Sequence, residues 1–257
     1  MPRYARKKSE TGIYHIIIRG TNRQEIFHDD EDCLRFLETL DRYKRKLKLE
    51  VYGWCLMGNH IHLLLKEGEE EIAKTMKRIG VSFVWYYNWK YNSTGHLFQD
   101  RFKSENVDTD EYLMTVIRYI HQNPVKASVV TKPSLWKWSS CKAYYGERTY
   151  PVDLLDDKFI LGIFSNDAKI AVEEFIKFNE SENKDICLDD EIKLRLTDEE
   201  AREEINKYIS NVEITKIKSL PKEVRDEKIR NLREIEGVSQ RQLARILGVS
   251  QFLIYRA

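Results

Sequence analysis

The sequence predicts an α+β fold of the ferredoxin-like or RRM-like type, followed by a small all-α domain. In this fold an antiparallel sheet is covered by helices on one face. Two observations support the prediction. Strand-type and helix-type segments follow one another in the order β-α-β-β-α-β between residues 13 and 107. Beyond residue 190 the spacing of apolar side chains is helical to the end of the chain.

The first strand and the first helix have clear local signals. Residues 13–19 are rich in isoleucine and end at Gly20, which predicts a strand. Four acidic residues at positions 29–32 then place negative charge where it stabilises a helix N-terminus. Apolar residues follow at helical spacing as far as Leu47, so we expect a helix over this stretch.

A hairpin and a second helix come next. Residues 50–57 and 60–66 both have strand character, and Gly58 and Asn59 between them suit a tight turn. Residues 71–91 repeat apolar side chains at helical spacing, which predicts the second helix. This helix carries five aromatic residues between positions 85 and 91. Such a cluster suits stacking on unpaired bases, but packing in the core is the interpretation we favour.

One more strand and one more helix complete this part of the chain. Residues 97–107 are predicted as a strand and residues 110–122 as a helix. Pro124 is expected to end that helix, because a proline disfavours helical geometry in the residue before it.

Bulk composition indicates a soluble cytosolic protein. The chain has 257 residues, of which 42% are hydrophobic and 33% are charged. Its apolar runs are far too short for a membrane span, and its basic N-terminus lacks the apolar segment of a secretory signal. Four widely spaced cysteines suggest reduced thiols. We therefore expect a cytoplasmic protein with no membrane partner.

Charge divides the chain into three blocks. Residues 1–150 contain 25 Lys and Arg against 19 Asp and Glu, a net charge of +6. Residues 151–205 contain 7 against 17 (−10), and residues 206–257 contain 11 against 6 (+5). Two basic blocks around an acidic one suggest two surfaces for a polyanion. Solvated helix faces give the same counts, so charge alone leaves both explanations open.

The C-terminal end has the pattern of a helix-turn-helix. Ser239 suits a helix N-cap, Ala244 is small enough to let a second helix approach, and Gly248 suits the turn. Ser250 then caps a short last helix, residues 251–257. A DNA-binding fold is the interpretation we favour over a plain helical hairpin.

These signals divide the chain into three predicted parts. Residues 1–150 form the main α+β domain. Residues 151–190 form an acidic helical extension and linker, and residues 191–257 form the helical domain with the helix-turn-helix.

Two histidines stand at the start of the third predicted strand. Side chains alternate between the two faces of a strand, so His60 and His62 point the same way while Ile61 faces the core. Two imidazoles one pleat apart suit a single metal ion. The tripeptide also arises often by chance, so on its own it is equally compatible with two polar residues on a solvated face.

A tyrosine and an asparagine lie close to the end of the helix at 110–122. Tyr119 and Asn123 are four residues apart and therefore share one helix face. Taken alone, a packed tyrosine followed by a C-terminal asparagine cap explains them. His121 points to another side of the same helix, so we do not expect it to share their role.

Several ordered sequence blocks together resemble a known family. They occupy residues 14–16 (Tyr-His-Ile), 19–23 (Arg-Gly-Thr-Asn-Arg), 55–63, 95–104, 119–124 (Tyr-Ile-His-Gln-Asn-Pro) and 138–140 (Trp-Ser-Ser). In these blocks the chain resembles the REP-associated tyrosine transposases. These belong to the single-tyrosine HUH superfamily, named for a histidine–hydrophobic–histidine motif. The C-terminal part is similar to the helix-turn-helix appendage of some relatives.

The resemblance implies a transposase-type enzyme that acts on single-stranded DNA with hairpin structure. His60 and His62 would be ligands of a divalent metal, Mg²⁺ or Mn²⁺, and Asn123 falls where relatives place a polar third ligand. Tyr119 would be the nucleophile. It would cleave and rejoin DNA through a 5′-phosphotyrosine without ATP. Two imidazoles favour manganese on chemical grounds.

DNA-contacting residues are expected around this site. Arg19, Arg23, Arg101 and Lys103 occur in the matching blocks and suit contacts to phosphates, although plain surface charge explains them equally well. The C-terminal helices suit duplex DNA. Either a monomer or a homodimer is compatible with the sequence.

Two other functions remain open at this stage. One is a catalytically silent regulator that binds specific duplex DNA through the helix-turn-helix. The other, weaker alternative is a zinc hydrolase built on His60 and His62, for which the sequence offers no third histidine or glutamate at a convincing spacing.

Overall fold

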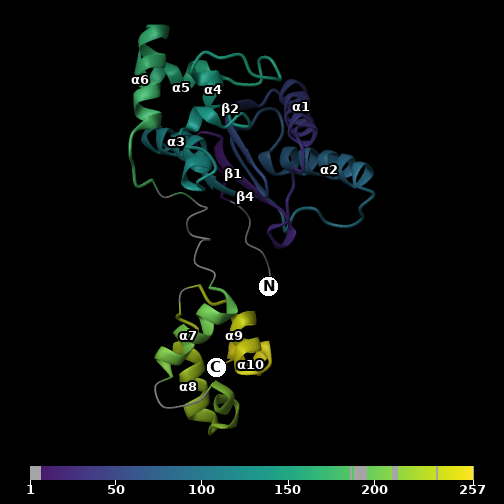
Figure 1. Ribbon diagram of the computed structural model, residues 1–257, viewed down its shortest axis with the longest axis vertical. Helices are drawn as coiled ribbons and strands as arrows, with labels where there is room; N and C mark the ends of the chain where they lie inside the picture. Colours follow the sequence, from purple (N-terminus) through teal and green to yellow (C-terminus); the bar gives the residue numbers. More distant parts are fainter. Residues whose placement is uncertain (1–6, 186, 188–195, 210–213, 236, 257) are drawn as a thin grey trace. The chain divides into compact units, whose positions relative to one another are not determined.

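The computed structural model describes residues 7–185, 187, 196–209, 214–235 and 237–256. The chain divides into two compact units, Met1–Cys187 and Leu188–Ala257. Figure 1 shows their helices and strands. In the part of the chain that the structure describes, no helix combines the length and the apolar character needed to cross a bilayer. All four cysteines of the sequence are free and buried.

The first unit is built on a four-stranded sheet. In chain order its elements are β1 (Ile13–Arg19), η1 (Thr21–Arg23), α1 (Asp30–Leu47), β2 (Glu50–Met57), β3 (His60–Lys66), α2 (Ile72–Lys90), β4 (Lys103–Asn106), α3 (Asp110–Lys126), η2 (Pro133–Leu135), α4 (Cys141–Tyr144), α5 (Asp157–Phe164) and α6 (Ala168–Glu180). The strand order is β2-β3-β1-β4, and every neighbouring pair is antiparallel. This order confirms the predicted ferredoxin-like arrangement.

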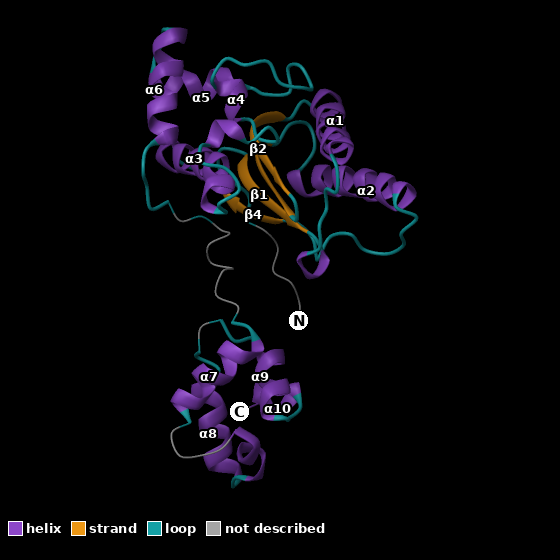
Figure 2. Cartoon of the chain, viewed as in Figure 1, coloured by secondary structure: helices purple, strands orange, loops and turns teal. Residues whose placement is uncertain are grey.

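Helices cover both faces of the sheet (Figures 1 and 2). Helices α1 and α2 pack on one face, as predicted, over side chains such as Ile16 and Ile61. Helix α3 packs on the opposite face with α4, α5 and α6, over side chains such as Cys55 and Leu64. The acidic extension therefore joins the first unit's core, because Phe175 of α6 is fully buried there.

The last strand is shorter than the predicted 97–107. Phe98 forms an isolated bridge with Gly20, whereas Lys103 pairs with Ile17. Four residues, 99–102, therefore span only two positions of β1, and the extra length makes the segment bulge away from the sheet. The alternation of side chains within one segment does not indicate how many residues of the neighbouring strand it will pair with, so the sequence could not predict this bulge.

The expected end of α3 at Pro124 is also wrong. Pro124 lies within α3, which ends at Lys126, and the backbone N–H of Ala127 still donates to the carbonyl of Asn123 at 2.9 Å. Because the proline lies in the last turn, it removes only one hydrogen bond of the helix.

The second unit contains only helices among its described residues. They are α7 (Asp198–Tyr208), η4 (Ile214–Ser219), α8 (Lys222–Leu232), α9 (Gln240–Leu247) and α10 (Gln251–Arg256). Ser239 caps α9, and Gly248 ends it with the left-handed backbone (φ 64°) that glycine adopts easily. The hydroxyl of Ser250 accepts from the N–H of Leu253 at the start of α10. The pattern at 239–250 therefore forms two short helices joined by a turn.

Close packing between α3 and β2 depends on Gly53. A Cβ at this position would lie 2.5 Å from Cδ1 of Ile117, which is fully buried on α3. We expect Gly53→Ala to lower the free energy of unfolding by about 1–3 kcal/mol, because the new methyl group overpacks the interface. Urea unfolding followed by tryptophan fluorescence measures the first unit specifically, because all five tryptophans precede residue 139.

A compensating substitution serves as the control. Ile117→Val removes Cδ1, so Gly53→Ala combined with Ile117→Val should be less destabilised than the sum of the two single variants. A strictly additive pair would show that the two side chains do not compete for this space.

Candidate active site

Strand β3 presents two histidines to the face that α3 covers. His60 and His62 lie on that face, whereas Ile61 between them is buried among side chains of the α1 and α2 face. The imidazole of His62 is fully buried and that of His60 is half-buried. The ring centroids of the two histidines are 5.1 Å apart. The expectation of two neighbouring imidazoles on one face thus agrees with the geometry.

Asn123 of α3 lies against both histidines. Its amide oxygen is 3.2 Å from Nε2 of His60, and its amide nitrogen is 3.1 Å from Nε2 of His62. Three side chains therefore direct their polar ends to one point. Because amide oxygen and imidazole nitrogen are both metal-ligand atoms, this donor set fits a divalent ion.

Tyr119 lies one turn earlier on the same helix. Its ring centroid is 5.8 Å from that of His62. The side chain is only 1% exposed. Above its ring lies the ammonium of Lys126, 4.4 Å from the centroid, which is a cation–π contact. The structure thus brings the predicted tyrosine, asparagine and both histidines together.

A second histidine pair adds a residue to which sequence reasoning assigned no role. Nε2 of His15 on β1 is 3.1 Å from Nδ1 of His62, and Nδ1 of His15 is 2.5 Å from a carboxylate oxygen of Glu105 on β4. His15 lies in the 14–16 sequence block, and its place on a strand beside β3 was a usable signal. Glu105 offered none, because its position depends on the register of β4.

The environment of His62 favours its neutral form. Burial lowers the pKa of His62 well below its ordinary value, and the positive charges that His60, His15 and Arg19 can carry lower this pKa further. A neutral imidazole has the free lone pair that a metal ion requires.

Another group of potential metal ligands lies beside the site. His15, Glu105 and Cys187 have ligand atoms within 4.8 Å of one another, the one such group found among the described residues. His15 of this group is also hydrogen bonded to His62. A metal ion bound by His15, Glu105 and Cys187 would therefore affect His62 as well.

Comparison with known proteins finds a family model that matches part of the chain. Residues 8–123, just under half of the chain, match the family of IS200-like transposases. This segment includes His60, His62, Tyr119 and Asn123. No curated protein matches the chain.

One solved structure is similar to this chain. It is described as a REP-associated tyrosine transposase bound to a REP hairpin. The two chains are 21% identical, the match covers 61% of this chain and 94% of that chain, and the TM-score is 0.48.

Two of the four predicted DNA-contacting residues share the histidine face of the sheet. Arg19 of β1 pairs with His60 across the β1–β3 ladder. Lys103 of β4 pairs with Ile17, which in turn pairs with His62. Residues directly opposite in a sheet project to the same face, so both cations lie beside the site.

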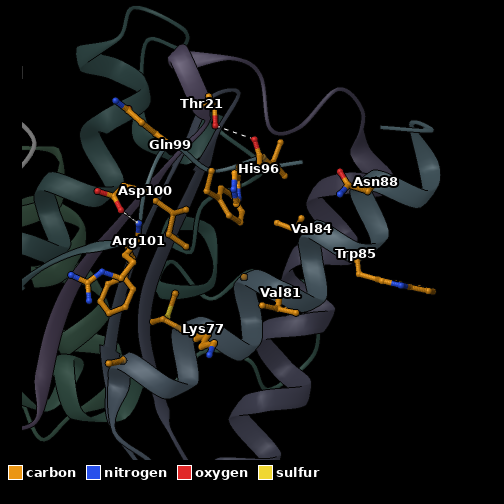
Figure 3. Close-up of a pocket in the computed structure, with 17 residues that line it drawn as sticks. Thr21, Lys77, Val81, Val84, Trp85, Asn88, His96, Gln99, Asp100 and Arg101 are labelled. Atoms are coloured by element: carbon orange, nitrogen blue, oxygen red, sulfur yellow. Dashed lines mark hydrogen bonds between the residues drawn. The ribbon is translucent and has the colours of Figure 1, made fainter. Parts of the chain in front are cut away.

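The other two predicted DNA-contacting residues lie outside the strands. Arg23 is exposed in the short helix after β1. Arg101 belongs to the bulged segment and lines a cavity of about 1040 Å³ between that segment and α2 (Figure 3). Arg101 therefore lies on the side of the sheet opposite to the histidines, because α2 packs there. Arg23 lies near the β2–β3 turn, where its backbone carbonyl accepts a hydrogen bond from the side-chain amide of Asn59 at 3.3 Å.

The aromatic cluster of α2 divides between core and surface. Tyr86 and Tyr87 are buried, as the core interpretation expects. Trp85 and Trp89 are 69% and 73% exposed, so the same interpretation is wrong for the tryptophans. Trp85 also lines this cavity, at the end away from Arg101 (Figure 3).

His121 of the first unit is turned away from Tyr119. Its ring nitrogens lie 2.8 Å from the hydroxyl of Ser140 and 3.1 Å from the amide oxygen of Asn179, and its side chain is fully buried. Burial lowers the pKa of His121 to about 3. These contacts give His121 a packing role.

The buried imidazole of His121 should make the free energy of unfolding depend on pH in the acid range. Its folded pKa lies below the unfolded value of about 6.5, so the unfolded chain takes up the proton first as the pH falls. The stability that neutral His121 contributes is complete above about pH 6.5 and is lost toward about pH 3. We expect His121→Gln to lose stability less steeply than wild type between about pH 6.5 and pH 4, by up to about 1.4 kcal/mol per pH unit.

Urea unfolding at several pH values measures this slope. Any contribution of His62 is common to both proteins and cancels in the comparison. Equal slopes in the two proteins would contradict the packing role of His121.

Proposed function

We propose that this protein is a metal-dependent enzyme that nicks and rejoins single-stranded DNA through a covalent bond to Tyr119. The observation that supports this most is the placement of Tyr119 and Asn123 on one face of α3, against His60 and His62. The match of residues 8–123 to the family of IS200-like transposases supports the same class of reaction.

Three side chains would hold the metal. His60 and His62 would ligate it through Nε2, and Asn123 through its amide oxygen, in place of the hydrogen bonds that now join them. When bound, Mg²⁺ or Mn²⁺ would neutralise a non-bridging phosphate oxygen. Arg19 and Lys103, on the same face, suit the flanking phosphates.

Tyr119 would then attack the phosphorus atom. Its phenolic oxygen forms a bond to phosphorus while the bond to the 3′ oxygen breaks, which leaves a 5′-phosphotyrosine and a free 3′-hydroxyl. The ammonium of Lys126 over the ring stabilises the negative charge of the phenolate. Attack by another 3′-hydroxyl reverses the step and joins new ends, so no ATP is needed.

DNA access requires a local movement. Tyr119 is 1% exposed, so its ring must turn out of the site, or the last turn of α3 must shift, before the phenol meets a phosphate. A flexible single strand with hairpin structure beside the cut suits such a confined site better than a continuous duplex. One chain supplies all four side chains, so a monomer is sufficient for the first step.

The covalent intermediate gives a direct test. With Mn²⁺, wild type should retain a 3′-labelled single-stranded oligonucleotide on a denaturing gel, whereas Tyr119→Phe and metal-chelated wild type should retain none. Tyr86→Phe, a change of the same kind on α2 across the sheet, should keep the adduct. Oligonucleotides with and without a hairpin reveal the structural preference. An adduct in Tyr119→Phe would exclude this mechanism.

A regulator of duplex DNA is the second candidate. The helix–turn–helix formed by α9 and α10 supports it, because α10 exposes Gln251 and Tyr255, which suit base contacts. In this case duplex binding should survive loss of His60 and His62.

A double substitution separates the two candidates. We expect Gln251→Ala combined with Tyr255→Ala to weaken specific duplex binding by about tenfold or more, because each good base contact contributes about 1–3 kcal/mol. Adduct formation on single-stranded DNA should stay at the wild-type level. Fluorescence anisotropy measures the first effect and the denaturing gel the second. Unchanged duplex affinity would remove α10 as the DNA-contacting element.

A further inference from the structure

We propose that His15 and Glu105 are positioning residues that fix the tautomer of His62, so that its Nε2 lone pair faces the metal. The inference rests on the proposed function, because it assumes that His62 ligates a metal ion. It adds two residues to which neither the histidine motif nor the tyrosine assigns a role.

The three side chains form a continuous hydrogen-bond chain across three neighbouring strands. Glu105 on β4 lies directly opposite His15 on β1, at 2.5 Å between carboxylate oxygen and Nδ1. Nε2 of His15 then lies 3.1 Å from Nδ1 of His62 on β3. Both imidazoles are fully buried. The phenol of Tyr112 on α3 is also hydrogen bonded to Glu105, which holds the outer end of the chain.

When both imidazoles are neutral, only one arrangement of protons satisfies both hydrogen bonds of the Glu105–His15–His62 chain. An ionised carboxylate can only accept, so His15 must donate to Glu105 through Nδ1–H. Nε2 of His15 is then an acceptor, and His62 must donate to it through Nδ1–H. Nε2 of His62 consequently carries a lone pair, and this atom lies 3.1 Å from Asn123 at the proposed metal position. Carboxylate–histidine partners of this kind orient metal-bound imidazoles in proteins.

The same logic argues against a separate metal site at His15, Glu105 and Cys187. A metal on Nδ1 of His15 would move the proton of that ring to Nε2, which would then donate to Nδ1 of His62. His62 would carry its proton on Nε2 and could no longer ligate a metal there. With neutral imidazoles the two metal sites therefore exclude each other.

Metal affinity of the full-length chain tests the proposal. His15→Phe keeps a ring but removes the acceptor, and Glu105→Gln keeps the shape but can both donate and accept. We expect His15→Phe to weaken Mn²⁺ binding about 10–100-fold, measured by isothermal titration calorimetry, and Glu105→Gln to weaken it less. Glu50→Gln, on the opposite edge strand β2, is the matched control and should bind like wild type.

A second readout separates positioning from a general loss of structure. Two-bond proton–nitrogen NMR spectra of metal-free protein labelled at its six histidines report which ring nitrogen carries the proton. His62 should be the Nδ1–H form in wild type and a mixture of both forms in His15→Phe. Thermal unfolding verifies that the variant is folded.

Three results would overturn the proposal, and they can be told apart. Unchanged Mn²⁺ affinity with an unchanged His62 tautomer in His15→Phe overturns this inference alone. Zinc binding that survives loss of His60 and His62 but is lost in Cys187→Ser also overturns it, in favour of a separate metal site. Absence in wild type of any Mn²⁺ binding that depends on His60 overturns the proposed function as well.

Discussion

Helix α3 lies against a sheet face that carries buried polar side chains, and the candidate site depends on this contact. Burying an imidazole is costly unless it is hydrogen bonded, so the histidines of this face require partners. His15 meets this need within the sheet, and Asn123 meets it from α3. The helix that satisfies these groups also carries Tyr119 beside them. Gly53 contributes by letting α3 approach β2 closely.

Local periodicity was sufficient to predict much of this site. Alternation along a strand places His60 and His62 on one face, and a spacing of four residues places Tyr119 and Asn123 on one side of a helix. Both rules depend only on neighbouring residues, so they hold whatever the rest of the chain does. The order of strand-type and helix-type segments predicted the sheet for the same reason. The family resemblance, and not the periodicity of either segment, suggested that α3 lies over β3.

Features that depend on pairing between distant segments could not be predicted. The contact of His15 with Glu105 joins residues 90 positions apart and follows from the register of β4. The bulge at 99–102 arises because four residues oppose two, which no single segment reveals. Pro124 was expected to end α3, but a proline in the last turn costs little. Trp85 and Trp89 were expected to pack because they belong to an aromatic cluster on the second helix, yet their positions on that helix turn them to solvent.

Pulsed electron paramagnetic resonance of bound Mn²⁺ tests the central claim, that the two histidines of β3 hold one metal ion opposite Tyr119. The wild-type spectrum should show coupling to the nitrogens of two imidazoles. His60→Ala should retain the coupling of one imidazole only. Mn²⁺ without nitrogen coupling would be held by oxygen ligands elsewhere, and that result would contradict the account.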